Sequence, residues 1–584
     1  MTTQRRGAAF VAVLSAGALA LTACGGGSSD TDSDDEGSGD GGTQSGTITV
    51  ASDTEFTSYN GNSDTGNGTW NQFVLNGVLL NFWEYAPEGG AVPFEEYGTY
   101  EKTSDDPLTV EYKINEDAVW SDGDPIDCDD FLLDWASSSG YYKTDEVGED
   151  GQPVPLFTAP SSVSYGLVEK PDCEPGAKDF TLVYTQPYAD WKLTTSSFLP
   201  AHVAAEQGGL TPEEFVAAIK ADDQAALAPV AEFWNSGWDM ASGQLLDPAL
   251  IPSSGPYVID SWDAGQSMTL KANENYWGTP PKTETIVIRF IAQDQQVQAL
   301  ANGEVDVISP QVSPDLKASL DALGEQVEVI EGDLLTWEHL DFNQNAGEVF
   351  ADPNLREAFA KCVPRQQIVD NLIKPANSEA VVMDLREIFP WDESYDEVRE
   401  AAVGDKYDDV DIEGAKALVD AAGAAGTEIH IARSEINQRR ADTVALIKSS
   451  CDQVGFNIVD TPAPDMGQVL GNPAGNQVLL YAWAGSGNLT SGASLYKTGE
   501  GQNPFGYSNP AVDAAWDELV VTLDEDRQLD LLTEIETNLW SDLFSIPLYA
   551  HPGITAHAPG IEGVVNNAAQ TQVSFNMDEW SRSS

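Results

Sequence analysis

The sequence predicts a protein of the α/β class with more than one hydrophobic core. The chain has 584 residues, which is more than one core normally supports. Residues 108–114 alternate apolar and polar side chains, as a half-buried strand does. Residues 428–459 have the pattern of a strand, a helix with one apolar face and a second strand. Such a unit places its two strands parallel in one sheet and its helix on a face of that sheet.

The first 24 residues carry the features of an export signal. Residues 5–6 are arginines, residues 10–21 are an apolar stretch, and residues 21–24 (LTAC) resemble a bacterial lipobox. On this interpretation residues 1–23 are removed and the thiol of Cys24 receives a diacylglycerol, which anchors the chain to the outer face of the cell membrane. An uncleaved membrane helix is the alternative, but the apolar stretch is shorter than a span requires. The twin arginines leave the export route open.

Residues 24–46 are expected to form a flexible acidic tether, because they are mainly Gly, Ser, Asp and Thr. A flexible coil of this length reaches roughly 25 Å. The acidic spacing at residues 30–34 is similar to a calcium-binding loop. Asp35, however, stands where that loop needs glycine, and Gly41 stands where it needs a bidentate glutamate. We therefore expect a solvated tether here.

Several segments of the first half have specific local patterns. Residues 47–51 are expected to form the opening strand, and residues 108–114 a second one. Asp127 is placed to cap a helix whose buried side begins at Phe131. A helix is expected to end at Gly303, after which Val305, Val307 and Ile308 begin an apolar crossing strand suitable for a hinge.

The strand–helix–strand unit of the second half has a clear sequence pattern. Residues 428–432 form its first strand, and Gly455 ends its helix before the second strand at 456–459. The buried face of the helix is expected to contain Val444, Ile447, Cys451 and Val454.

The chain is strongly acidic, with 28 Lys and Arg against 95 Asp and Glu and a formal net charge of -67. This charge argues against nucleic acid or an anionic membrane surface as a partner. General surface solubility explains it better than a cationic ligand does. Because carboxylates are so abundant, two that are close in sequence say little about acid–base catalysis.

Four cysteines remain besides Cys24, and an exported chain predicts two disulfides among them. Three pairings are possible, of which we favour Cys128 with Cys173 and Cys362 with Cys451. Each bond would then join one half of the chain to itself. Four buried free thiols are the alternative.

No catalytic signature and no cofactor motif is found in the sequence. The five histidines are scattered, and none forms the i, i+4 pair of a zinc helix. Neither a phosphate-binding glycine loop with lysine, nor a dinucleotide fingerprint, nor a nucleophile elbow occurs. We therefore expect no cofactor, no metal and no enzymatic activity.

A series of short motifs runs along the chain in a consistent order. They are AVWSDGDPIDCDDFLLDW at 118–135, SGPYVI at 254–259, NENYWG at 273–278, IVIRF at 286–290, ALANGEVDV at 299–307, DFN at 341–343, LREAF at 355–359, PRQQIV at 364–369, GAKALV at 414–419, GYSNP at 506–510 and SIPLY at 545–549. In this order the chain resembles the family 5 extracellular solute-binding proteins, the peptide-binding receptors of ABC importers. The resemblance covers nearly all of the chain after residue 46.

The resemblance implies a two-lobed periplasmic-binding-protein-like α/β fold of type II, in the large peptide-binding class, with an extra subdomain in the first lobe. We expect lobe 1 over 47–309, including an inserted subdomain at about 85–250, and lobe 2 over 310–542. Residues 543–584 would return to lobe 1. Two crossing strands would join the lobes, which close over a solute. The implied partners are a peptide or other small solute, the transmembrane subunits of an ABC permease and, through the lipid anchor, the membrane; we expect a monomer.

The solute site is expected to be largely apolar and lined with aromatic side chains. Trp483 is the leading candidate, because residues 481–483 end an apolar strand-like run that opens into the Gly- and Ser-rich residues 484–493. The other candidates are Tyr481, Tyr496, Phe342, Asn343, Trp337, Phe56 and Tyr59. For each aromatic residue, ordinary core packing is the competing interpretation.

One position departs from the peptide-binding pattern. Peptide receptors of this family often place an aspartate shortly after the tryptophan, where it pairs with the amino terminus of the ligand, but residues 484–490 contain no acid. Asn488 can accept a hydrogen bond from an ammonium without neutralising it, and Glu338 or Glu435 can substitute from another loop. Arg433 is a candidate for binding a ligand carboxylate, with a surface ion pair as the alternative.

We therefore expect a membrane-tethered receptor that captures oligopeptides for uptake. A receptor for a sugar or another polar solute is the alternative within the class, because aromatic side chains also stack on sugar rings. A secreted hydrolase that acts through paired carboxylates is the alternative outside it.

Overall fold

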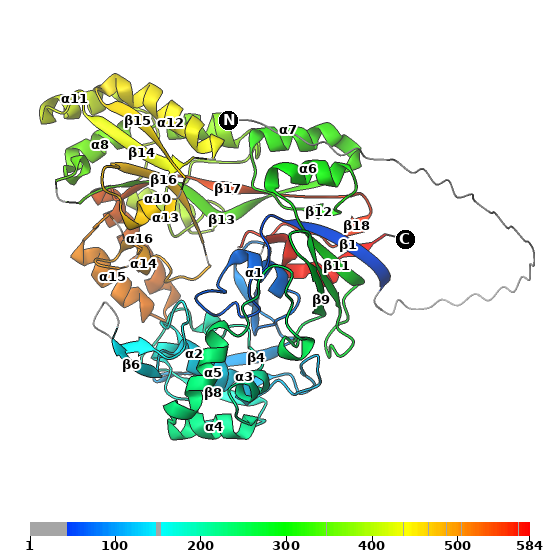
Figure 1. Cartoon of the computed structure of the whole chain (residues 1–584). Helices are drawn as coiled ribbons and strands as arrows, with labels where there is room; N and C mark the ends of the chain where they lie inside the picture. The colour runs from blue at the N-terminus through cyan, green and yellow to red at the C-terminus, as the bar shows by residue number, and fades with distance from the viewer. Residues whose placement is uncertain are drawn as a thin grey trace, which may run out of the picture. The chain divides into compact units, whose positions relative to one another are not determined.

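A ten-stranded mixed sheet forms the framework of the chain, which we describe from a computed structural model (Figure 1). The strands follow the order β15-β14-β16-β13-β17-β12-β1-β11-β10-β9. Their bounds are β1 (Gln44–Ser52), β9 (Tyr257–Asp263), β10 (Ser267–Ala272), β11 (Thr283–Phe290), β12 (Val307–Ile308), β13 (Glu328–Phe342), β14 (Glu428–Ser434), β15 (Asn457–Ala463), β16 (Val478–Ala484) and β17 (Ser545–His557).

The structure describes residues 44–147, 153–345, 347–435, 437–464, 466–485, 487–500, 502–503, 505–569 and 572–583. The predicted signal peptide, Cys24 and the tether up to residue 43 lie outside these residues. Among the described residues, none of the helices combines the length and hydrophobicity that a membrane crossing requires.

Strands β13 and β17 are shared by the two ends of the sheet. They pair antiparallel from Glu328 opposite His557 to Asp341 opposite Ser545, whereas β16 joins β13 only from Thr336 onward. We call lobe 1 the part built on β1 and β9–β12 (residues 44–327 and 561–583), and lobe 2 the part built on β14–β16 (residues 343–544). The lobes are therefore joined by two crossing strands.

The crossing strand expected at residues 305–308 is not where the chain crosses. Gly303, at a φ of +69°, does end helix α6 (Gln293–Ala301), but the following β12 is only two residues long. Its Val307 lies beside Val50 of β1, inside lobe 1. Helix α7 (Pro314–Leu323) then packs through Leu320 in the same apolar cluster as Ala51 and Leu300. The crossing strand is β13, whose partly exposed first half lacks the apolar run that marked β12.

The insert of lobe 1 contains its own three-stranded sheet and four of the helices. Its strands are β2 (Trp83–Tyr85), β3 (Ala91–Pro93), β4 (Gly98–Asp105), β5 (Leu108–Ile114), β6 (Lys143–Val147), β7 (Pro153–Pro155) and β8 (Asp179–Val183), of which β4, β5 and β8 form the sheet. Its helices are α2 (Cys128–Ser138), α3 (Ala201–Gln207), α4 (Pro212–Ala221) and α5 (Gln224–Ser236). Buried residues of the insert and of β1, β10 and β11 form a single apolar cluster, so the insert is part of the lobe 1 core.

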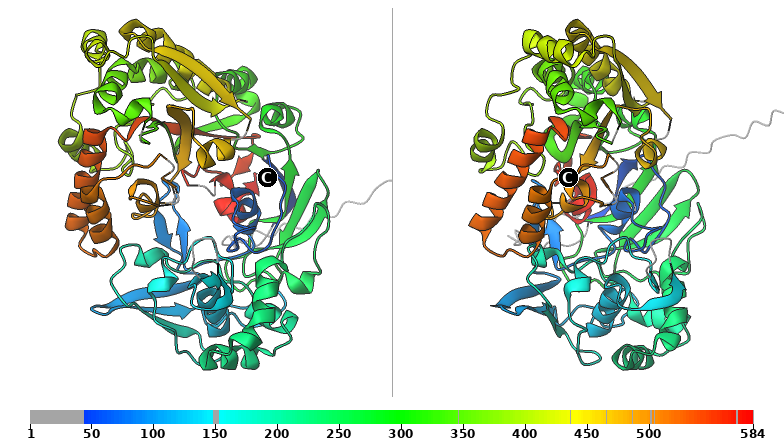
Figure 2. Two further views of the ribbon diagram at one scale, coloured as in Figure 1. Left: turned by 60° about the vertical axis from the view of Figure 1, so that its left-hand side comes forward. Right: turned by 90° about the vertical axis from the view of Figure 1, so that its left-hand side faces the viewer.

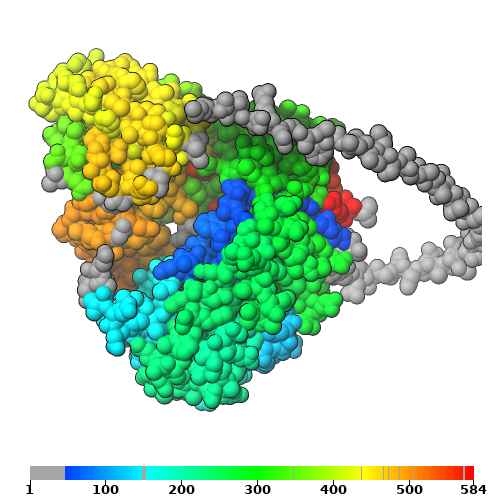
Figure 3. Space-filling model, in the orientation of Figure 1, coloured from blue at the N-terminus to red at the C-terminus, as the bar shows by residue number. Residues whose placement is uncertain are grey.

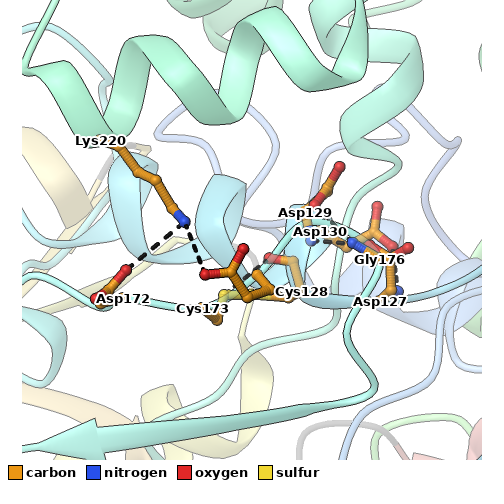
Figure 4. Close-up of a disulfide and its surroundings, with 9 residues drawn as sticks. Asp127, Cys128, Asp129, Asp130, Asp172, Cys173, Gly176 and Lys220 are labelled. Atoms are coloured by element: carbon orange, nitrogen blue, oxygen red, sulfur yellow. Dashed lines mark hydrogen bonds and ion pairs between the residues drawn. A yellow bond between two sulfur atoms is a disulfide. The ribbon is translucent and has the colours of Figure 1, made fainter.

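The predicted cap of α2 is confirmed. Asp127 accepts a hydrogen bond from the backbone N–H of Asp129, and a reciprocal capping box with Asp130 closes the first turn. Cys128, directly after the cap, is bonded to Cys173 in the loop before β8 (Figure 4). On that loop Asp172 lies 3.6 Å from Nζ of Lys220, at the end of α4. The disulfide therefore lies wholly within lobe 1.

Lobe 2 contains the predicted parallel unit. Strands β14 and β15 pair in parallel and are connected by α12 (Gln438–Cys451), whose Val444, Ile447 and Cys451 are almost completely buried. Gly455 follows the helix at a φ of +109°. Cys451 is bonded to Cys362 at the end of α8, so this disulfide also stays within one lobe.

The remaining helices of lobe 2 are α8 (Pro353–Cys362), α9 (Arg365–Ile368), α10 (Tyr395–Ala402), α11 (Ile412–Ala422), α13 (Met466–Gly471), α14 (Ala493–Tyr496), α15 (Pro510–Val520) and α16 (Glu525–Asp542). Helix α1 (Thr69–Leu75) belongs to the lobe 1 core, and the short strands β18 (Ile561–Glu562) and β19 (Ser581–Arg582) complete the fold. Helices α15 and α16 lie side by side in both views of Figure 2 and form a second core of lobe 2. Ile561, Val573 and Trp580 are buried in the lobe 1 core.

Candidate functional site

A cavity of about 640 Å³ lies between the insert of lobe 1 and lobe 2, and we call it the interlobe cavity. Its lobe 1 wall contains Ala91 and residues 189–193. Its other walls are contributed by β13, by the loop 386–389, by the segment from Trp483 to Leu495, and by the start of α16. Figure 3 shows the orange residues of lobe 2 directly above the cyan residues of the insert. The cavity is within the size range of small-molecule sites.

The crossing strand β13 divides its side chains between two faces. Leu335 and Trp337 line the interlobe cavity, whereas Leu334 and Thr336 line a smaller cavity of about 250 Å³ that also contains His551. This division follows from the strand geometry, because successive side chains point to opposite faces of a sheet.

Two tryptophans form an aromatic wall of the interlobe cavity. Trp337 on β13 and Trp483 on β16 are direct partners in the antiparallel register. Behind them His339 lies nearly parallel to Trp483, with ring centroids 6.4 Å apart, and Tyr481 packs edge-on against Trp483 at 5.3 Å. Asp341 holds both of these inner rings, through His339 Nδ1 at 2.7 Å and the Tyr481 hydroxyl at 2.6 Å. The wall is therefore supported by a hydrogen-bonded second layer.

Asp190 links the lobes at the edge of the cavity. Its carboxylate accepts hydrogen bonds from the backbone N–H groups of Leu489 (2.8 Å) and Thr490 (3.0 Å) and from the Thr490 hydroxyl (2.6 Å). The neighbouring Ala189 N–H donates to the carbonyl oxygen of Val520 at 2.8 Å. Burial raises the pKa of Asp190, while these three hydrogen bonds favour its charged form. The lobes are thus held in contact by bonds that exist only when they approach each other.

Arg386 lines the cavity, and each of its three guanidinium nitrogens donates a hydrogen bond to a neighbouring residue. Its Nη1 lies 2.8 Å from Oε2 of Glu536, and its Nε and Nη2 donate to the hydroxyl and carbonyl oxygens of Ser545. Both members of the Arg386–Glu536 pair have fully buried side chains. We infer that this arginine positions the loop 386–389.

Three of the predicted site residues line the interlobe cavity: Trp483, Trp337 and Asn488. Tyr481 lies in the second layer just described. The other six do not reach the cavity: they are the charged residue Arg433, described below, and Phe56, Tyr59, Phe342, Tyr496 and Asn343.

Packing explains why the last five of these residues lie elsewhere. Phe56 and Tyr59 belong to the lobe 1 core, Phe342 packs against Phe350 and Phe359, and Tyr496 packs against Trp516. The Asn343 side chain is buried and donates to the carbonyl oxygen of Asn476 at 3.0 Å, which shapes a loop. For the four aromatic residues, the competing interpretation of core packing applies.

The charged candidates outside the cavity are also satisfied internally. Arg433 forms a bidentate ion pair with Asp460 across the β14–β15 pair, at 2.8 and 2.7 Å. The alternative interpretation of Arg433, an ion pair within the protein, therefore applies. Glu338 is fully buried on the opposite face of β13 from Trp337, where it binds Arg440 and His551. Glu435 is exposed and does not line the cavity.

Several cavity residues have no distinctive sequence pattern. Asp190, Lys192, Glu387 and Phe389 sit in loops far apart in the chain and are brought together only by the approach of the lobes. One sequence feature pointed toward them: residues 484–490, after Trp483, contain no acid, so a carboxylate of the site would have to come from another part of the chain.

A cavity enclosed by two α/β lobes that share two crossing strands defines a ligand-binding protein of the two-lobed class. The chain belongs to the bacterial extracellular solute-binding proteins, family 5, whose sequence profile matches residues 95–495. The predicted fold class and family are confirmed. Members of this family are extracytoplasmic and bind solutes for ABC transporters.

Individual relatives agree with this assignment. An uncharacterized lipoprotein of Mycobacterium tuberculosis is 27% identical over 566 residues, covering 92% of this chain and 94% of its own. The structure of the periplasmic EDTA-binding protein EppA superimposes with a TM-score of 0.78 at 22% identity, covering 93% of this chain and 97% of its own. The oligopeptide-binding protein AppA of Bacillus subtilis, in complex with a nonapeptide, gives 0.69 at 15% identity, with 93% and 100% covered. At these identities the structures show a shared fold.

Proposed function

We propose that this protein captures oligopeptides in the interlobe cavity and delivers them to an ABC permease. The observation that supports this proposal most strongly is a cavity lined by residues of both lobes. Its aromatic wall consists of Trp337 and Trp483, and polar side chains such as Asn488 and Gln502 lie around that wall. Such a site buries apolar side chains of varied shape while hydrogen-bonding a peptide backbone. The peptide complex of AppA, on the same fold, supports this choice.

Closure of the lobes is the expected response to the solute. A solute that contacts Trp191 on lobe 1 and Trp483 on lobe 2 makes both contacts only when the lobes are together. Binding therefore shifts the population toward the closed form. The protein performs no chemistry on the solute in this mechanism.

The proposal also covers how the receptor stays close to the membrane and its permease. Lipidation at Cys24 and the tether 24–46 would keep a monomeric receptor beside the membrane while it reorients. The M. tuberculosis relative, named a lipoprotein, supports the anchor. Incorporation of labelled palmitate, lost in Cys24→Ala, tests it.

A polar solute such as a sugar or a chelate is the second candidate. The lobe 1 wall supports it, because Lys192 lies over the Trp191 ring at 5.7 Å, beside the cavity. EppA, an EDTA-binding protein, shares the fold. Mass spectrometry of the solute that co-purifies with the protein separates the two: a peptide mixture supports the main proposal, and a single saccharide or chelate overturns it.

Trp483→Ala is expected to weaken binding of a peptide mixture by about tenfold or more, because it removes half of the aromatic wall. The melting temperature of the empty protein should change little, since Trp483 is only partly buried. Isothermal titration calorimetry and thermal unfolding measure the two effects.

Trp516→Ala is the matched control, because Trp516 is completely buried in the second core of lobe 2 and does not line the cavity. It should lower the melting temperature clearly. If Trp483→Ala destabilises the empty protein as much as Trp516→Ala does, Trp483 is a core residue.

Asp190→Ala is expected to favour separated lobes and to weaken solute binding by about tenfold. The variant loses the three hydrogen bonds by which the carboxylate joins lobe 1 to lobe 2. Small-angle scattering should show a larger radius of gyration for the empty protein.

Asp172→Ala removes an exposed carboxylate of the same lobe, which lies 3.6 Å from Lys220 Nζ, and should leave the radius of gyration and the solute affinity unchanged. An Asp190→Ala protein with the radius and affinity of the wild type would show that this link does not control closure.

A further inference from the structure

Five charged side chains line the interlobe cavity: Asp190, Lys192, Arg386, Glu387 and Glu525. Asp190 and Arg386 are bonded within the protein, as described above. Lys192 and Glu525 are exposed to solvent. Glu387 is therefore the ionisable group that is both partly withdrawn from water and, among the described residues, without a hydrogen-bond or ion-pair partner for its carboxyl group.

The surroundings of Glu387 hold it in place without neutralising it. Its backbone N–H donates to Oε1 of Glu536 at 3.1 Å, which anchors the residue. Its carboxylate lies against Gly492, where a Cβ atom would overlap it. The close packing at Gly492 fixes the direction of the side chain.

The charges that face Glu387 come from several elements. Arg386, on the same loop, is attractive, but its donors are committed to Glu536 and Ser545. Glu536 on α16 repels it, and Tyr496 on α14 presents a buried hydroxyl that has no hydrogen-bond partner among the described residues. Burial and the Glu536 charge raise the pKa of Glu387 to about 8. The empty cavity thus contains a carboxylic acid that lacks a counter-ion.

Resting on the proposed capture of peptides, we propose that Glu387 binds a protonated amine of the solute and gives the cavity its preference for cationic groups. A bound ammonium supplies the missing counter-ion, and the aromatic rings of Trp337 and Trp483, which line the same cavity, attract a cation as well. Glu387 takes the role of the acid that is absent from residues 484–490.

A consequence of this arrangement is release of a proton on binding. Below about pH 8 the empty protein holds Glu387 protonated, and pairing with an ammonium requires the carboxylate. The proton passes from Glu387 to the solvent when the ammonium binds. Affinity should therefore rise as the pH increases from 6 toward 8.

The test compares free tripeptides with the same tripeptides acetylated at the amino terminus. Native mass spectrometry of an equimolar mixture should show that the wild type prefers the free peptides by about thirtyfold or more, the range for loss of a buried charge partner. Glu387→Gln should bind both sets equally. Glu393→Gln, an exposed glutamate away from the cavity, should keep the wild-type preference.

Calorimetry on the wild type in two buffers of different ionisation enthalpy gives a reading that needs no variant. At pH 6.5 we expect release of close to one proton per bound free tripeptide. Equal binding of free and acetylated peptides, or no proton release, overturns the role of Glu387 while leaving peptide capture intact. Binding of neither set overturns peptide capture and this inference with it.

Discussion

Arg386→Ala is expected to lower the free energy of unfolding of lobe 2 by about 3–5 kcal/mol. The substitution leaves Glu536 as an unpaired charge in a site that is fully buried in the wild type. It also removes the bonds to the Ser545 hydroxyl (2.8 Å) and carbonyl (2.7 Å) at the start of β17. The measurement is chemical denaturation followed by tryptophan fluorescence, since Trp540 lies 5.0 Å from the guanidinium.

Arg527→Ala provides the control, because Arg527 forms a single exposed ion pair with Glu518 at 2.8 Å. Exposed pairs contribute at most about 1 kcal/mol, so this variant should unfold almost as the wild type does. A loss below about 1 kcal/mol for Arg386→Ala as well would contradict our assignment of the buried pair as a structural support of the cavity.

Glu338→Ala is expected to cost a similar amount, about 3–5 kcal/mol, at the junction of the lobes. Glu338 on β13 binds Arg440 Nε at 2.5 Å and His551 Nε2 at 2.8 Å, and Arg439 Nη2 lies 3.6 Å away. Without the carboxylate, two arginines face each other in a buried region between the crossing strands and α12. Because β13 and β17 join the lobes, both lobes should unfold at a lower denaturant concentration.

The pH dependence of the wild type checks the same cluster. Its hydrogen bond with His551 and the charges of the two arginines hold the pKa of Glu338 well below its usual value despite its burial, and burial lowers the pKa of His551 to about 4. A group with a depressed pKa makes the fold less stable as the pH falls below its unfolded value. The melting temperature should therefore fall between pH 6.5 and pH 4 through His551, and further below pH 4.5 through Glu338. A wild-type melting temperature that stays constant from pH 7 to pH 4 would argue against this arrangement.

Local patterns predicted much of the fold. The strand at 108–114, the cap at Asp127 and the unit from β14 to β15 each depend on residues close together in the sequence, and the structure shows all three. The crossing strand was placed wrongly because the apolar run at β12 marks a buried strand but does not show which strand it pairs with. A two-residue apolar strand inside lobe 1 and a fifteen-residue strand between lobes are distinguished by pairing, which no local pattern reports.

Three of the predicted residues line the interlobe cavity. Trp483 was predicted because its strand opens into a glycine-rich loop, and the predicted Trp337 and Asn488 line the same cavity, Trp337 as the partner of Trp483 in register. Phe56, Tyr59, Phe342 and Tyr496 could not be separated from ordinary core residues, because an aromatic side chain in a core and one in a pocket follow the same sequence pattern.

The sequence alone thus indicated an exported α/β chain of this family and predicted Trp483 as a residue of the solute site, because motif order, hydrophobic periodicity and capping are local properties. Only the tertiary structure showed which charges are paired. From the sequence, Arg433 and Glu338 were candidates for binding the solute. The structure instead pairs Arg433 with Asp460 and Glu338 with Arg440. No sequence pattern marked Glu387 as a residue of the cavity, because the protonation and the partners of a carboxylate depend on the groups that surround it in space.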